Sequence, residues 1–388
     1  MVEFKTIGEI CLKVFAGGTP STKREDYYDG DIPWIRSGEI DFNVITSAER
    51  NITELGYKES SAKKIRKNSV VMAMTGATVA KSAVVSIETT ANQSVCAMET
   101  NESITNYKYV YYCLAEDYFK IKSSAQGALT SLNLAMIKNI EIPIPSLDEQ
   151  NRIVGILDTF TDSIENLKQQ IAQRRKQYEH YRDQLLDLEG KDGVETVMLD
   201  EICNIKGRIG FRGYTRDDQV EEGKGALSLS PGNIVNGKMD YSSSTFITWY
   251  KYEESPEIKI YNNDVIFCKT GSTVGKVAIV ENLPYKATIN PQLVVLKDIT
   301  TDFRYLAYYL ATFPLQSKVK ALAGVGSVPN ISQSKLGSLE IPIPSSNEQQ
   351  RIVSILDTFE ANISNLEAQL AQRQKQYEYY RNQLLTFE

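Results

Sequence analysis

The segment TGSTVGKV at 270–277 combines glycines and a lysine in the manner of a phosphate-binding loop. In the standard loop, four residues separate the first glycine from the Gly-Lys pair, and a Ser or Thr that holds magnesium follows. Here three residues separate Gly271 from Gly275, and a valine follows the lysine. The matching segment TGATVAKS at 75–82 has no second glycine. We therefore expect no nucleotide binding. A tight strand–turn–strand is the plainer prediction, and contact of the lysine or the backbone amides with a DNA phosphate is the alternative.

Other catalytic signatures are missing from the sequence. DNA amino-methyltransferases carry an Asn/Asp-Pro-Pro-aromatic tetrapeptide, and the nearest string is NPQL at 290–293. His180 is the only histidine, and the five cysteines form no CxxC pair. This pattern argues against a zinc site and a disulfide framework and fits a reducing cytoplasm. We predict a recognition protein that is not an enzyme, with no cofactor or metal of its own.

Basic and small polar residues in the predicted loops are the candidate DNA contacts. Arg and Lys neutralise phosphates, and Arg can also grip guanine in the major groove. The candidates in the first half are Thr19, Ser21, Lys23, Arg24, Arg36, Lys63, Lys64, Arg66 and Lys67. Those in the second half are Lys206, Arg208, Arg212, Tyr214, Arg216, Lys269 and Lys276. For each of them the alternative is a solvated surface charge. The run 206–216 is the most persuasive, because its arginines interleave with aromatic residues and glycines.

The net charge of −6 is unevenly distributed. Residues 1–147 and 190–346 are close to neutral, and most of the acidic excess lies in 148–189 and 347–388. Each large block can therefore still present a basic face to DNA. No run of eighteen or more apolar residues occurs, and the N-terminus lacks the pattern of a secretory signal, so neither a membrane span nor export is expected.

One passage of the chain occurs twice. EIPIPSLDEQNRIVGILDTF at 141–160 returns as EIPIPSSNEQQRIVSILDTF at 340–359, and the likeness continues through AQRRKQYEHYRDQLL and AQRQKQYEYYRNQLL. Such a long repeat indicates an internal duplication of a whole domain with its appendage.

The repeated appendage has the heptad spacing of a long coiled-coil helix. Its seam positions are Ile153, Leu157, Phe160, Ile164, Leu167, Ile171 and Tyr178 in the first copy, and Ile352, Leu356, Phe359, Ile363, Leu366, Leu370 and Tyr377 in the second. Arg174 and Arg373 fall on the same seam. Their stems are expected to pack while their head groups reach Glu165 or Glu367, and a register-setting polar pair is the alternative.

The two helices are expected to run antiparallel. A helix of this length spans about 60 Å, whereas the polar connector at 189–195 reaches at most about 25 Å. A parallel pair would need the chain to return over the full helix length. The antiparallel pair needs no return, and it gives the duplicated chain a pseudo-two-fold axis with one globular block at each end.

The fold class is therefore mixed α/β. We predict target-reading blocks at 1–147 and 190–346, separated by helices at 148–189 and 347–388. Within each block, short β-branched runs punctuated by Gly and Asn indicate strands and turns.

Taken together, these features resemble the specificity subunit of type I restriction-modification systems. The resemblance rests on the block–helix–block–helix order, on the two IPIP segments with the helix starts that follow them, on GGTPSTKREDYYDGDIPWI at 17–35, and on GRIGFRGYT at 207–215. It covers nearly the whole chain.

The resemblance implies that each block recognises one half of a split site on double-stranded DNA. It also implies that the coiled coil sets the spacing and docks two methyltransferase subunits, which methylate adenine at N6 with S-adenosylmethionine. Restriction endonuclease subunits that use ATP and Mg would join through them. The alternatives are a coiled-coil scaffold that binds only proteins, a DNA-binding protein without methyltransferase partners, and a self-sufficient methyltransferase or NTPase.

Overall fold

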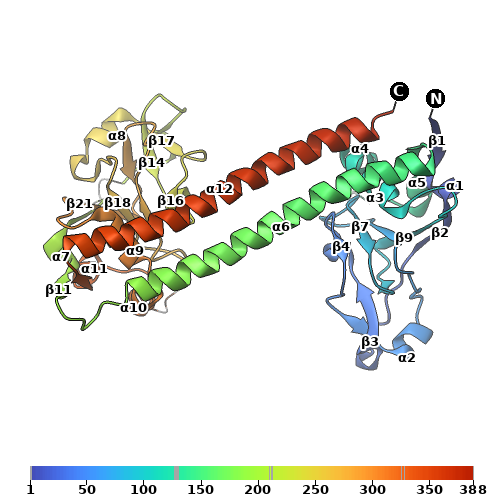
Figure 1. Cartoon of the computed structure of the whole chain (residues 1–388), viewed down its shortest axis with the longest axis horizontal. Coiled ribbons are helices and arrows are strands. Elements are labelled where there is room, and N and C mark those ends of the chain that lie inside the picture. Colours follow the sequence, from blue (N-terminus) through green and yellow to red (C-terminus); the bar gives the residue numbers. More distant parts are fainter. Residues whose placement is uncertain are drawn as a thin grey trace. The chain divides into compact units, whose positions relative to one another are not determined.

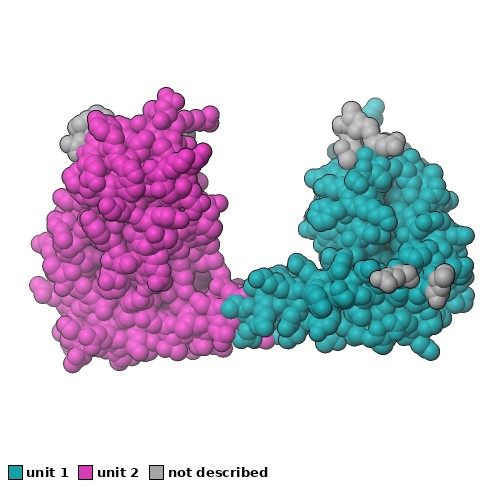
Figure 2. Space-filling model, turned by 90° about the horizontal axis from the view of Figure 1, so that it is seen from above, with its two compact units in different colours: residues 1–168, 368–388 teal, residues 169–367 magenta. Residues whose placement is uncertain are grey.

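The computed structural model describes residues 2–125, 131–208, 210, 213–324, 326 and 328–387. The chain divides into two compact units, residues 1–168 with 368–388 and residues 169–367 (Figure 2). Each unit combines a globular α/β part with portions of the long helices α6 (Leu147–Leu185) and α12 (Ser346–Leu385) (Figure 1). The fold is therefore mixed α/β, as predicted.

The globular part of unit 1 is built from β-strands and short helices. The strands are β1 (Glu3–Thr6), β2 (Cys11–Ala16), β3 (Tyr28–Ile35), β4 (Val44–Ile45), β5 (Asn51–Ile52), β6 (Val70–Ala73), β7 (Ser82–Val85), β8 (Thr90–Ala91), β9 (Val95–Thr100) and β10 (Glu141–Ile144). The helices are α1 (Ile7–Ile10), α2 (Glu54–Lys58), α3 (Tyr107–Glu116), α4 (Tyr118–Ser124) and α5 (Leu134–Lys138). Strands pair in the orders β2-β9-β6-β7-β4, β5-β3-β8 and β1-β10.

The globular part of unit 2 repeats this plan. Its strands are β11 (Glu195–Met198), β12 (Asn204–Gly207), β13 (Gln219–Val220), β14 (Ala226–Leu229), β15 (Ile234–Val235), β16 (Lys238–Met239), β17 (Thr245–Ile247), β18 (Val265–Cys268), β19 (Val277–Ile279), β20 (Ala287–Ile289), β21 (Leu293–Lys297) and β22 (Glu340–Ile343). Its helices are α7 (Leu199–Ile202), α8 (Trp249–Glu253), α9 (Phe303–Leu310), α10 (Phe313–Ala323) and α11 (Gln333–Gly337). The strand orders are β12-β21-β18-β19-β16-β15, β13-β17-β14-β20 and β11-β22.

The long helices pack against each other in antiparallel directions, as the short connector between them predicted. Within unit 2, Arg175 pairs with Glu367, Tyr178 donates a hydrogen bond to Glu360, and Tyr181 lies against Phe359. Residue numbers rise along α6 as they fall along α12. The ring pair of Phe160 and Tyr380 in unit 1 is the repeat-equivalent contact with the helices exchanged.

A buried glutamine joins each globular part to its long helix. The Gln150 side chain accepts hydrogen bonds from Thr105 Oγ1 at 2.9 Å and the Asn106 amide at 3.0 Å, and it donates to the Ile104 and Pro145 carbonyls. Its equivalent Gln349 binds Thr301, Asp302 and Pro344 in the same way. Because buried polar groups are costly when unpaired, these contacts hold the helix start in one position.

Aspartates about two turns further along the helices strengthen the same junction. Asp158 accepts hydrogen bonds from Tyr112 Oη at 2.7 Å and from Lys108, both on α3. Asp357 is bound in the same way by Tyr308 and Arg304 on α9. The duplication read from the sequence thus extends to the contacts that position each block on its helix.

We predict that Gln150→Leu destabilises unit 1 by about 3 kcal/mol, because the Asn106 amide and two carbonyls lose their buried partner. Hydrogen exchange of unit 1 amides is the suitable measurement, since a chain of two units need not unfold in one step. Arg152→Ala is the control. Arg152 is exposed and pairs with Glu149 on the same helix, so its loss should cost at most about 0.5 kcal/mol. Equal effects of the two substitutions would contradict the role given to Gln150.

Candidate nucleic-acid interface

Some of the sequence candidates in unit 1 join lysines that the sequence did not single out. A hollow of about 530 Å³ is lined by Leu12, Lys13, Val14, Phe15, Lys63, Lys64 and Lys138. The Lys63 ammonium lies 5.5 Å from the centre of the Phe15 ring. We call Lys13, Lys63, Lys64 and Lys138 the lysine patch. Lys13 and Lys138 come from β2 and α5, far apart in sequence, so no local motif could reveal them.

Charge compensation at the lysine patch is limited. Glu99 lies 3.8 Å from Lys13 and 3.0 Å from the candidate Arg66, and its side chain is only 3% exposed. Because this single buried carboxylate faces two cations, Lys13 and Arg66, the surface stays positive. Such a surface suits a polyanion.

The remaining unit 1 candidates differ in their exposure and in whether their charge is paired. Arg24 pairs with Asp26 and lies 4.5 Å from the Tyr27 ring, and Arg36 pairs with Glu39 and Glu49, so both charges are largely balanced. Thr19 donates a hydrogen bond to Gln93. Ser21, Lys23 and Lys67 are exposed. The loop that carries Thr19 lies against the 61–67 segment, since a Cβ on Gly18 would come within 2.3 Å of the Ser61 backbone.

The unit 2 candidates divide into exposed, half-buried and buried residues. Lys206, Arg216 and Lys276 are exposed, and Lys276 donates to the Ile234 carbonyl at 3.0 Å. Lys269 and Tyr214 are half-buried, and the Tyr214 hydroxyl accepts a hydrogen bond from Ser228 at 2.7 Å. Arg212 lies outside the described residues.

Arg208 departs from the expectation for a DNA-reading residue. Its side chain is 5% exposed, donates to the Ile289 carbonyl and Thr288 Oγ1 at 3.0 Å each, and lies 5.4 Å from the Tyr214 ring. Burial lowers the pKa of its guanidinium. These contacts lie inside the block, so the structure favours a packing role for Arg208 and gives it no route to a base in this conformation.

The TGSTVGKV segment forms a tight turn between β18 and β19. Its amides bond within the turn and to β18: Val274 to the Gly271 carbonyl, Gly275 to Cys268 and Lys276 to Thr273. The 75–82 segment makes the same bonds between β6 and β7, with Ala80 at φ +68° where Gly275 has φ +96°. Because these three amides are already paired, they are not available to cradle a phosphate. The prediction of a tight strand–turn–strand is confirmed, and contact of the lysine or the remaining amides with a DNA phosphate stays a prediction.

The apolar and tyrosine residues predicted for the heptad seam are all buried or half-buried. Ile153, Leu157, Ile352 and Leu356 are fully buried and belong to the cores of their own units. Tyr178 bonds Glu360 at 3.1 Å. The prediction for the seam arginines is corrected. Arg174 is exposed and donates a hydrogen bond to Gln177, and Arg373 lies over the Phe160 ring. The neighbouring Arg175 is the residue that reaches Glu367.

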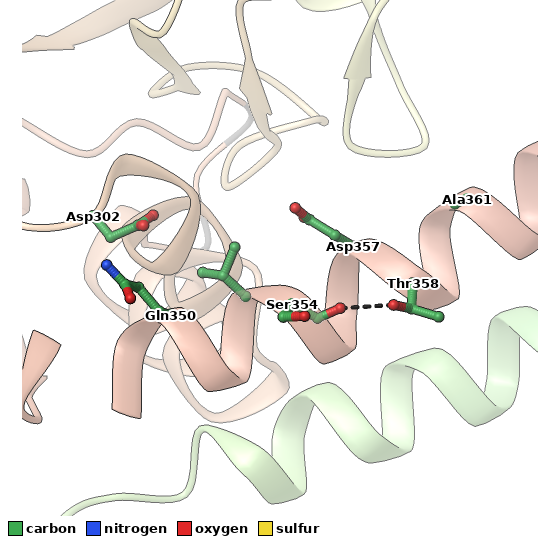
Figure 3. Close-up of a pocket in the computed structure, with 7 residues that line it drawn as sticks. Asp302, Gln350, Ser354, Asp357, Thr358 and Ala361 are labelled. Atoms are coloured by element: carbon green, nitrogen blue, oxygen red, sulfur yellow. Dashed lines mark hydrogen bonds between the residues drawn. The ribbon is translucent and has the colours of Figure 1, made fainter. Parts of the chain in front are cut away.

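A hollow of about 450 Å³ on α12 is lined by Asp302, Gln350, Val353, Ser354, Asp357, Thr358 and Ala361. Figure 3 labels all of these residues except Val353. The Asp302 carboxylate caps α9 by accepting from the Arg304 and Tyr305 amides, and Asp357 binds Arg304. Both carboxylates thus have structural partners. Within the described residues, no three His, Cys, Asp or Glu side chains are grouped to hold a metal.

The thiols are also poorly suited to nucleophilic chemistry. Burial raises the pKa of Cys11, Cys96, Cys113 and Cys203 to about 12, so these thiols stay protonated at neutral pH. Among the helices of the described residues, none has the length and apolar character needed to cross a bilayer.

Residues 1–174 and 191–373 match the family model described as the type I restriction modification DNA specificity domain. The chain belongs to this family. It is a DNA-specificity component of the type I system and not a catalytic subunit. This membership confirms the resemblance seen in the repeats.

Two relatives show how far the likeness extends. The chain is 36% identical over 195 residues to the EcoR124I/EcoR124II specificity subunit of Escherichia coli, a match that covers 47% of this chain and 48% of that protein. It is 28% identical over 392 residues to the MjaIX specificity subunit of Methanocaldococcus jannaschii, covering 95% and 88% of the two chains.

Solved structures show the same fold. The crystal structure of the S subunit from M. genitalium aligns with a TM-score of 0.61 at 17% identity, over 100% of this chain and 97% of that one. A structure described in connection with complex assembly and conformational transition of the type I R-M system aligns with a TM-score of 0.64 at 19% identity, over 99% and 97%.

We predict that Arg208→Ala destabilises unit 2 by about 2–4 kcal/mol, since it leaves Thr288 and the Ile289 carbonyl without their buried donor and opens a cavity. Arg216→Ala, at an exposed position nearby in sequence, should leave stability nearly unchanged. Hydrogen exchange of the unit 2 amides measures both. Unchanged protection in Arg208→Ala, combined with weaker DNA binding, would restore the base-contact interpretation.

Proposed function

We propose that the chain gives a type I complex its DNA sequence specificity, with one block reading each half of a split site. The reading blocks would be 1–147 and 190–346, and the helices at 148–189 and 347–388 would set the distance between the half-sites. The observation that carries this proposal is the duplicated junction. Gln150 with Asp158, and Gln349 with Asp357, hold two blocks of different sequence on their helices through the same contacts.

Duplex DNA would be held first through its phosphates. The lysine patch, with little acidic compensation, is the strongest candidate in unit 1 for such contacts. Phosphate contacts fix orientation and carry no sequence information, so they must be joined by side chains that read bases. Because the two blocks differ in sequence, the half-sites should differ, and the full site need not be palindromic.

The long helices would also dock two methyltransferase subunits. In unit 1, Tyr380 is 44% exposed beside Phe160, and Tyr379 is 62% exposed beside Tyr380. In unit 2, Tyr181 is 44% exposed beside His180. Exposed aromatic residues are typical anchors of protein interfaces. Since the repeat places equivalent residues in both units, two copies of one partner fit better than a single partner.

Those partners would supply the chemistry. We propose that the methyltransferase subunits bind S-adenosylmethionine and methylate adenine at N6, and that endonuclease subunits using ATP and Mg attach through them. The chain itself would need no cofactor. Such a complex would act on DNA in the cytoplasm.

Two alternatives make different predictions. A scaffold that binds only proteins would show no sequence preference on DNA, with or without methyltransferase partners. A self-sufficient methyltransferase would transfer label from S-adenosylmethionine to DNA when incubated alone. The protonated thiols and the structural partners of the Asp302 and Asp357 carboxylates give the latter no support.

We predict that inserting one heptad into each long helix lengthens the spacer between the two half-sites and leaves the half-site sequences unchanged. The reason is that a heptad adds about 10 Å of helix and preserves the apolar seam. Mapping methylated adenines made by the complex with its methyltransferase partners measures both properties.

Inserting a heptad into only one helix is the control, because it breaks the seam register and should abolish modification. A spacer that stays the same in the double insertion would contradict the proposal that the helices act as a ruler. The lack of any preferred site in the parental complex would contradict the proposed function itself.

A further inference from the structure

The turn that first suggested a phosphate loop belongs to a three-part edge present in both units. In unit 1 the edge consists of 75–78, 92–94 and 131, and in unit 2 of 270–273, 290–292 and 330. We call these segments the turn edge. The middle segment of the unit 2 edge is Asn290-Pro291-Gln292, the first three residues of the NPQL string that differs from the methyltransferase signature.

Backbone hydrogen bonds hold the three segments together in the same way in each unit. The Met74 amide donates to the Ser94 carbonyl at 2.8 Å, and the Leu132 amide donates to the Met74 carbonyl at 2.8 Å. In unit 2, Lys269 donates to Gln292 and Ile331 donates to Lys269, both at 2.9 Å.

The middle segment also makes the same hydrogen bonds in both units. In unit 1 the Asn92 carbonyl accepts from the Val95 amide and its side chain accepts from the Ser94 amide. Asn290 does the same with the Leu293 and Gln292 amides. Both asparagines therefore shape the turn, which explains why the same residue type stands at both places.

The side chains on this common backbone differ between the units. Gln93, which is exposed, stands where unit 2 has Pro291, and the exposed Gln292 stands where unit 1 has Ser94. Asn330 is exposed where unit 1 has Ser131. Two blocks that read different half-sites require such a surface, in which the backbone is the same and the polar side chains differ.

The amide groups are suited to base edges and are partly arranged in advance. Gln93 accepts a hydrogen bond from Thr19, Asn330 accepts from Thr270 at 2.6 Å, and Gln292 accepts from Asn290 at 3.2 Å. In each pair the accepting amide uses its oxygen for this bond, and its NH₂ group remains as a donor for a base. Asn and Gln side chains pair with adenine N6 and N7 in the major groove.

Cations border the turn edge of unit 2. A cleft of about 590 Å³ includes Thr273 and Gly275 of the turn, together with the basic residues Arg175, Arg182, Lys238, Lys276 and Lys320. Its acidic lining residues are Glu179, Glu360 and Glu367, and Arg175 already pairs with Glu367. Lys238 and Lys276 donate to a hydroxyl and a carbonyl, which a phosphate could replace. Phosphate-binding groups next to base-reading groups are the usual composition of a DNA interface.

We propose that the turn edge reads bases, with Gln93 acting on one half-site and Gln292 with Asn330 on the other. The proposal rests on the proposed function and names the residues that would carry its specificity. None of the three was among the basic candidates chosen from the sequence.

The test uses the full chain assembled with its methyltransferase subunits and bound to a randomised DNA library that is then sequenced. We expect Gln292→Ala with Asn330→Ala to lower discrimination about 10-fold at one or two positions of one half-site and to leave the other half-site unchanged. Gln93→Ala should relax only the other half-site. Gln292→Glu should shift the preference toward cytosine, because a carboxylate accepts a hydrogen bond from cytosine N4.

Gln219→Ala is the matched control, because Gln219 is an exposed glutamine of unit 2 that lies on β13, outside the three segments of the turn edge. It should preserve both half-sites. Unchanged half-sites in all the turn-edge variants, or an equal loss of binding to every sequence, would overturn this inference. A bipartite preference in the parental complex would still stand in that case. Its absence would instead overturn the proposed function.

Discussion

Antiparallel packing of α6 against α12 is the constraint on which the rest depends. The contacts of Arg175 with Glu367 and of Tyr181 with Phe359 fix the direction of one helix relative to the other. The stacking of Phe160 on Tyr380 repeats the second contact with the helices exchanged. A helix pair of this kind turns a duplicated sequence into two equivalent supports. Each support then has to hold a block in a defined orientation, and the buried glutamine and half-buried aspartate at each junction do so.

The duplication separates what must stay constant from what can vary. Contacts that position a block are repeated almost atom for atom, including the hydroxyl of Tyr109 on the Pro143 carbonyl and that of Tyr305 on the Pro342 carbonyl. The turn backbones are repeated as well. The exposed side chains on those turns differ between the units, and so do the basic surfaces. This division matches a protein that presents two different reading surfaces from one scaffold, and it agrees with membership of the DNA specificity family.

Local patterns predicted the helices, their direction and the turn at 270–277, because heptad spacing and connector length constrain them directly. They did not predict the burial of Arg208. A local sequence of arginine, glycines and aromatic residues looks the same whether the arginine lies in an exposed loop or under a sheet edge. Its partners Thr288 and Ile289 lie about 80 residues away in sequence. The sequence predicted only two of the four residues of the lysine patch, for the same reason. Lys63 and Lys64 lie in a visible cluster, but Lys13 and Lys138 reach it only through tertiary folding.

Chemical cross-linking of the two long helices measures the central claim most directly. A short bis-maleimide reagent should join cysteines introduced as Arg175→Cys and Glu367→Cys, read by mass spectrometry of the linked peptides. The native thiols that burial keeps protonated, such as those of Cys96 and Cys113, should react little. Arg175→Cys with Gln374→Cys, which occupy equivalent positions of the two repeats, should remain unlinked. Linking of this second pair and not the first would show helices running in parallel and contradict the account.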